Sequence, residues 1–167
     1  MIQTVVSRFL WFAGLLLLQA LVLNHIHIYG YATPMPYIYF LLILPDSTPR
    51  WAYVALGFAL GFLLDLFTTT PGVAAASMTL CGLVTPWVLR LFAPSDDDDN
   101  AFYPSRRTMK WGGFLRYALT LCLLHCLCFL TLEAFSFHDA GTLALSVAAS
   151  TTLTLLVVAA LEYARTR

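Results

Sequence analysis

Apolar residues run along this chain in long blocks that short polar stretches separate. The blocks occupy residues 5–23, 51–67, 73–92, 111–135 and 142–163. Their lengths approach or exceed the roughly 20 residues that a helix needs to cross the hydrocarbon core of a bilayer. The pattern therefore predicts an all-α, polytopic membrane protein.

A further apolar block is too short to cross a bilayer as a straight helix. Only the eight residues YIYFLLIL lie between Pro36 and Pro45, fewer than a spanning helix requires. This block is either a re-entrant piece or a span that the preceding aromatic residues extend. Residues 45–49 are expected to form the turn that follows it.

The basic residues decide between these alternatives. If the short block crosses, six spans place all nine Lys and Arg residues on the side of both termini. If it does not cross, the basic residues from Arg50 to Arg116 move to the opposite side and the asymmetry is lost. Because basic residues concentrate in cytoplasmic loops, we expect six transmembrane helices and cytoplasmic termini. The second span is then short, tilted or broken.

Composition supports a membrane location and excludes several other classes. The chain is 60% hydrophobic and 11% charged, whereas about 25% of the residues of a soluble domain are charged. Residues 1–167 are expected to form a single integral membrane domain. The first block resembles a signal peptide, but it continues to Leu23 without a clean cleavage site, so we expect it to be retained as a span. The net charge of zero makes nucleic acid an unsuitable partner.

Residues 94–110 form the only long polar stretch and are predicted to be a cytoplasmic loop between the fourth and fifth spans. Four consecutive aspartates occupy positions 96–99. Blocks of like charge usually stay extended and solvated. We favour a solvated loop over the alternative, a docking site for a basic cytoplasmic partner.

The stretch GFALGFLLDLFTTTPG, residues 57–72, combines small residues with one carboxylate. Gly57, Gly61 and Asp65 are spaced four residues apart and share one helix face. A charge at mid-membrane costs about 2.5–3.5 kcal/mol, so it normally faces protein or water. Asp65 is either a solvated or turn-capping carboxylate at the head-group level, or a buried hydrogen-bonding residue beside the glycine face. We favour the second interpretation.

His125 and Glu133 lie eight residues apart, on roughly one face of the fifth predicted helix. Glu133 falls near the outer end of that helix, at a depth comparable with that of Asp65. Two carboxylates at one level suggest a proton or ion site. We favour two separate polar anchors, because no third ionisable group completes a relay at that depth.

Neither a metal site nor an enzyme is predicted. Cys122, His125 and Cys126 share a helix face, but zinc ligands usually come from paired residues on turns, and cysteine in an apolar helix is ordinarily a small hydrophobic residue. Asn24 and His25 in the outer loop are better explained as polar interface residues. No Walker loop, dinucleotide fingerprint or Gly-x-Ser-x-Gly is present, so no cofactor is expected.

Three stretches together resemble the rod shape-determining protein MreD family, in particular its Bacteroidetes-type members. They are VLNHIHIYGYATPMPYIYFLLILP (22–45), GFALGFLLDLFTTTPGVAAAS (57–77) and LCLLHCLCFLTLEAFSF (121–137). The most specific features are Gly-x-x-x-Gly-x-x-x-Asp followed by Pro71-Gly72, then Asn24-His25, and then His125 with Glu133. Length and the number of apolar segments also agree.

The resemblance implies a non-enzymatic scaffold in the bacterial inner membrane that supports rod shape and lateral peptidoglycan synthesis. Its implied partner is MreC and, through MreC, MreB, RodA and a penicillin-binding transpeptidase. The implied fold is similar to the six-helix substrate-binding components of energy-coupling-factor vitamin transporters. Site residues carried over as structural or partner-binding are Asn24, His25, Gly57, Gly61, Asp65, Pro71, Gly72, His125 and Glu133.

The resemblance to vitamin transporters also defines the alternative function, a small-molecule-binding component of such a transporter. Those proteins resemble one another in an Ala-x-x-x-Ala motif on the first helix, which engages the transport motor. In this chain Ala13 and Ala20 are seven residues apart. The motif is absent, which favours the scaffold.

Overall fold

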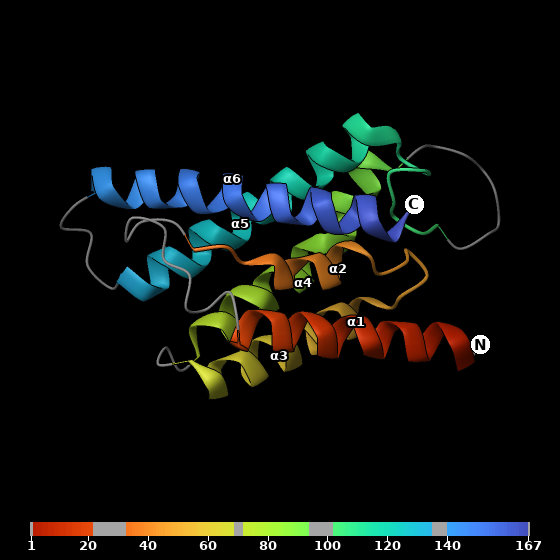
Figure 1. The fold of residues 1–167 in the computed structure, drawn as a ribbon, viewed down its shortest axis with the longest axis horizontal. Helices are drawn as coiled ribbons and strands as arrows, with labels where there is room; N and C mark the ends of the chain where they lie inside the picture. Colours follow the sequence, from red (N-terminus) through yellow and green to blue (C-terminus); the bar gives the residue numbers. More distant parts are fainter. Residues whose placement is uncertain (1, 22–32, 69–71, 94–101, 135–139, 167) are drawn as a thin grey trace.

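The structure of the protein, a computed structural model, describes residues 2–21, 33–68, 72–93, 102–134 and 140–166 (Figure 1). Every regular element in these ranges is helical, as the apolar pattern predicts. In chain order the elements are α1 (Ile2–Leu21), the short 3-10 helix η2 (Pro36–Ile38), α2 (Tyr39–Leu42), α3 (Arg50–Phe67), α4 (Val73–Phe92), α5 (Lys110–Ala134) and α6 (Ala140–Arg165).

Four of the described helices, α3, α4, α5 and α6, are long and apolar enough to cross a membrane. The part of α1 whose side chains are described, Val6–Leu21, is a shorter apolar helix. Large apolar side chains cover much of the outer surface of these helices. Exposed examples are Phe9, Trp51, Phe58, Leu66, Leu83, Leu91, Leu127 and Leu156. Water does not favour such a surface, whereas lipid does, so the chain is a membrane protein.

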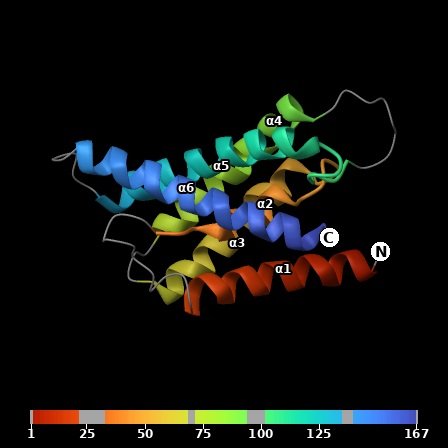
Figure 2. The same ribbon diagram turned by 45° about the horizontal axis from the view of Figure 1, so that its top comes forward.

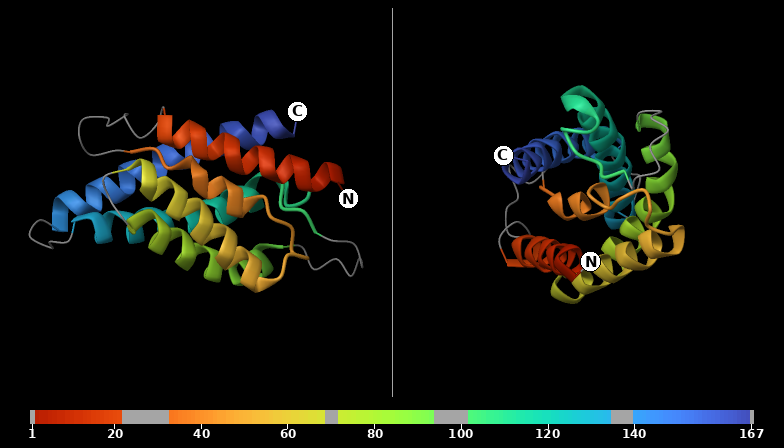
Figure 3. Two further views of the ribbon diagram at one scale, coloured as in Figure 1. Left: turned by 90° about the horizontal axis from the view of Figure 1, so that it is seen from below. Right: turned by 90° about the vertical axis from the view of Figure 1, so that its right-hand side faces the viewer.

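The long helices form a ring around the short segment that contains η2 and α2 (Figure 3, right). Neighbours in the chain are neighbours in the ring: α3 packs on α4, α4 on α5 and α5 on α6, while α1 packs on α3. The N-terminal end of α1 and the C-terminal end of α6 lie at the same end of the molecule (Figures 1 and 2).

The short apolar block becomes the centre of the protein. Residues 34–45 are all buried, and the segment runs through the middle of the ring as an extended stretch, η2, α2 and a turn. Pro36 begins η2, and helical hydrogen bonding stops soon after Leu42. A non-helical backbone at membrane depth is tolerated where protein surrounds it. The ring of long helices provides these surroundings.

Candidate functional site

Polar side chains from four surrounding helices bind the central segment, residues 33–45. Thr154 Oγ1 accepts from the N–H of Met35 at 3.0 Å, and Ser150 Oγ accepts from the N–H of Thr33 at 3.1 Å. From α1, Gln19 Nε2 donates to the Pro34 carbonyl at 3.2 Å. These bonds replace those that an unbroken helix would make within itself, and a buried backbone group without such a partner is costly.

Two tyrosines of the same segment extend the network to α5 and α6. Tyr37 Oη lies 2.8 Å from His125 Nε2, and both side chains are buried. Tyr39 donates its hydroxyl hydrogen to Glu162 Oε2 at 2.7 Å. On the other side, the hydroxyl of Tyr53 in α3 bonds the carbonyls of Leu44 and Pro45. The central segment is therefore tied to the ring along its length.

The face that carries Gly57 and Gly61 packs directly on the backbone of α4. A Cβ atom added at Gly57 would lie 2.6 Å from the Met78 carbonyl oxygen, and one at Gly61 would lie 2.5 Å from that of Ala74. Gly82 of α4 makes the reciprocal approach, because its Cβ would meet the Tyr53 carbonyl oxygen at 2.5 Å. This face is therefore occupied by α4 within the same chain.

Asp65 is buried and caps the next helix. Its Oδ1 accepts from the N–H of Ala74 at 3.0 Å, and its Oδ2 accepts from the N–H of Ala75 at 2.9 Å. These groups are among the first N–H groups of α4, which no residue within the helix can bond. Gly72, which precedes α4, has a φ of +88° and no capping side chain of its own. The carboxylate thus supplies the missing acceptors, and its negative charge interacts favourably with the positive N-terminal end of the helix dipole.

The structure brings some of the predicted site residues together and separates others. Gly57, Gly61, Asp65 and Gly72 belong to one hairpin, formed by α3 and α4. His125 lies in the core, where its contact is Tyr37 rather than the hairpin. Glu133, predicted to share a helix face with His125 as a separate polar anchor, is exposed near the end of α5. The predictions for Asn24, His25 and Pro71 lie outside the described residues.

Several residues of the site were not predicted from the sequence. They are Tyr37, Tyr39, Ser150, Thr154 and Glu162, all of which bind across the bundle. A usable signal exists. Positions 150, 154, 158 and 162 share one face of α6 because they are four residues apart, and three of them, Ser150, Thr154 and Glu162, carry hydroxyl or carboxyl groups. What these side chains bind could not be inferred without the broken second segment.

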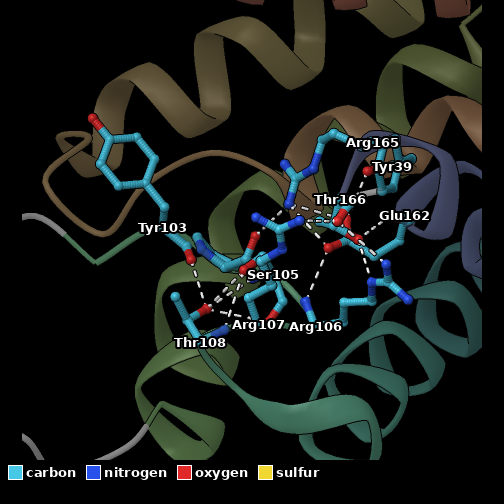
Figure 4. Close-up of polar contacts among 10 residues, drawn as sticks. Tyr39, Tyr103, Ser105, Arg106, Arg107, Thr108, Glu162, Arg165 and Thr166 are labelled. Carbon is cyan, nitrogen blue, oxygen red and sulfur yellow. Dashed lines mark hydrogen bonds and ion pairs between the residues drawn. The ribbon is translucent and has the colours of Figure 1, made fainter.

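A second polar cluster closes the end of the molecule where α6 terminates (Figure 4). Glu162 is fully buried and pairs with Arg165 at 3.0 Å; its Oε1 also accepts from the N–H of Arg106 at 2.9 Å. The side chains of Arg106 and Arg107 donate to Thr166, and Arg165 donates to the Pro104 carbonyl. This arginine cluster, Arg106, Arg107 and Arg165, ties the segment before α5 to the end of α6.

The described surface grooves are open and apolar. The larger, about 740 Å³, lies along α3 and α4 and is lined by residues that include Phe58, Phe62, Ala76, Leu80 and Leu83. A smaller groove of about 420 Å³ separates α1 from Leu161 of α6. Among the described residues, no group of three or more His, Cys, Asp or Glu side chains is placed to hold a metal ion.

Comparisons of the chain with protein-family models, curated proteins and solved structures give no match. The fold and the described contacts define the protein as an α-helical membrane protein. Its buried polar groups serve mainly to hold a broken central segment inside a ring of long helices.

Proposed function

We propose that the protein is a non-enzymatic scaffold of the MreD type in the bacterial inner membrane. It would support rod shape and lateral peptidoglycan synthesis by binding MreC and, through MreC, MreB, RodA and a penicillin-binding transpeptidase. The sequence resemblance around residues 57–72 motivates the proposal. The observation that supports it is the use of Gly57, Gly61 and Asp65 to lock α3 against α4. Such a closely packed helix pair suits assembly rather than chemistry.

The proposed topology has six spans and both termini in the cytoplasm. In this proposal the central segment, residues 33–45, is the second span, a short and broken crossing. Its burial and its external hydrogen-bond partners remove the main physical objection to a crossing without a full helix. The common location of the α1 N-terminal end and the α6 C-terminal end also fits an even number of crossings.

The transporter alternative receives less support. A vitamin-binding component needs an internal site that encloses most of its ligand. Among the described residues, the buried segment 34–45 fills the centre of the ring. The described grooves are open at the surface and do not enclose a ligand. The proposed similarity to the fold of energy-coupling-factor substrate-binding components concerns architecture and does not extend to ligand binding.

The outer face of the α3–α4 hairpin is the proposed contact surface. Phe58 and Phe62 stack there with ring centroids 5.7 Å apart, and both are about half exposed. Co-purification of tagged protein with co-expressed MreC tests the proposal. We expect the double variant F58A/F62A to retain less MreC, whereas L156A, a change at an exposed apolar residue of α6, retains the wild-type amount.

These variants test a direct contact with MreC without disturbing the packing of α3 on α4. Phe58 and Phe62 are exposed, whereas Gly57 and Gly61 contact α4. If MreC does not co-purify with the wild-type chain, the scaffold proposal is wrong. If MreC binds F58A/F62A as well as it binds wild type, the scaffold proposal stands and the contact surface lies elsewhere.

A further inference from the structure

Among the described residues, the arginine cluster carries more positive charge than its bonded partners neutralise. Arg106, Arg107 and Arg165 contribute a formal +3, and Glu162 contributes −1, so the described charged groups that bond within the cluster sum to +2. Glu162 is fully buried, and both of its oxygens already accept hydrogen bonds. The remaining partners of Arg106 and Arg107 are the uncharged hydroxyl and carbonyl of Thr166.

The guanidinium groups also keep unused hydrogen-bond donors. Each arginine side chain has five N–H donors in a fixed fork that matches phosphate and carboxylate oxygens. Arg107 is exposed and uses only Nη2 in its bond to the Thr166 carbonyl, among the described residues. Arg106 is held in place by the rings of Tyr163, at 4.6 Å, and Trp111, at 5.8 Å. The guanidinium groups of Arg106 and Arg107 are therefore held in position and keep N–H donors that an anion can accept from.

The surroundings of the cluster match the interface of a membrane. Trp111 and Tyr163 lie against Arg106 and are 43% and 53% exposed, and such aromatic side chains concentrate where lipid head groups meet the hydrocarbon. Further along α5 and α6, Leu119 and Leu156 are exposed and offer an apolar surface to acyl chains. A cationic surface suited to a lipid head group and an apolar surface suited to acyl chains thus lie next to each other along the same two helices.

We infer that the arginine cluster is a binding site for the phosphate head group of an anionic phospholipid. The phosphate oxygens accept hydrogen bonds from the free donors of Arg107 and Arg106, while the acyl chains lie along α5 and α6. Basic sites between helices at the membrane surface bind anionic head groups in this way. The inference does not depend on the proposed scaffold function.

Native mass spectrometry of the intact, detergent-purified chain tests the site. Phosphatidylglycerol and phosphatidylcholine with the same acyl chains are titrated in turn, and the wild-type chain is expected to prefer phosphatidylglycerol. R107Q should weaken phosphatidylglycerol binding about fivefold, the effect of removing one interfacial arginine. R107K keeps the charge but lacks the planar fork, so it should recover part of the affinity that R107Q loses. R50Q is the matched control, because Arg50, like Arg107, is exposed, and it begins α3 outside the arginine cluster.

Three results would overturn the inference. The first is equal binding of the two lipids by the intact chain. The intact chain is used because it includes the four aspartates at positions 96–99, whose negative charge could compete with a lipid phosphate. The second is the same loss of phosphatidylglycerol in R50Q as in R107Q. The third is displacement of the lipid by millimolar inorganic phosphate, which would indicate a site for the free ion. A thermal unfolding curve of R107Q that matches wild type confirms that the variant is folded.

Discussion

Thr154 of α6 accepts a hydrogen bond from the backbone N–H of Met35, at 3.0 Å and in the buried interior. The two residues are 119 positions apart. This contact shows how the broken second segment is stabilised, because a side chain from a distant helix takes the place of a carbonyl in the segment's own helix.

Replacing Thr154 by valine should destabilise the protein by about 1–3 kcal/mol, because it leaves a buried N–H without an acceptor while preserving side-chain shape. Unfolding in detergent, followed by circular dichroism, measures the change. T152V is the control: Thr152 is exposed, and its hydroxyl donates to the Ala148 carbonyl of the same helix, so its effect should stay within about 0.5 kcal/mol. Equal stability of T154V and T152V would show that the Met35 contact contributes nothing.

The cap that Asp65 provides makes a second prediction. D65A removes both acceptors of the α4 N-terminus and should cost about 2 kcal/mol or more, while D65N keeps one oxygen and should cost about 1 kcal/mol. Asp46 is exposed, so D46N serves as the control for loss of charge and should be near neutral. If D65A unfolds at the same temperature as wild type, the cap is not a source of stability.

Two glycines in apolar helices should respond oppositely to alanine. In G61A the new Cβ would lie 2.5 Å from the Ala74 carbonyl oxygen and 2.7 Å from the Ala75 Cα, so the helix backbones must separate, at a cost of about 1–3 kcal/mol. In G14A nothing lies within 4 Å, and the higher helix propensity of alanine should stabilise α1 by up to about 1 kcal/mol. Unfolding curves of the two variants test the difference, and a neutral G61A would contradict the close packing.

The proposed topology predicts the accessibility of the turn before α3. Ser47 is exposed, and in a six-span protein S47C lies on the cytoplasmic side. A membrane-impermeant maleimide should label S47C in broken cells but not in intact spheroplasts. The C128S background removes the most exposed of the native cysteines, since Cys81, Cys122 and Cys126 are buried. Labelling of S47C in intact spheroplasts would rule out the six-span topology.

Much of the architecture could be predicted from local pattern. Long apolar blocks require helices in lipid because only a helix satisfies its own backbone there, and the turns at Pro45 and Gly72 follow from backbone chemistry that proline and glycine carry with them. The four-residue spacing of Gly57, Gly61 and Asp65 likewise determines that they share a face, because the helix period is a local property.

The tertiary structure alone decided what that face meets and where the short block lies. Asp65 bonds Ala74 and Ala75 only because the hairpin brings the start of α4 to its carboxylate. Residues 34–45 lie at the centre because polar side chains such as Thr154, far away in the sequence, satisfy their backbone. The sequence by itself determined the helices, the shared faces and the membrane class. The partners of its polar groups depend on contacts between distant segments, which no local spacing encodes.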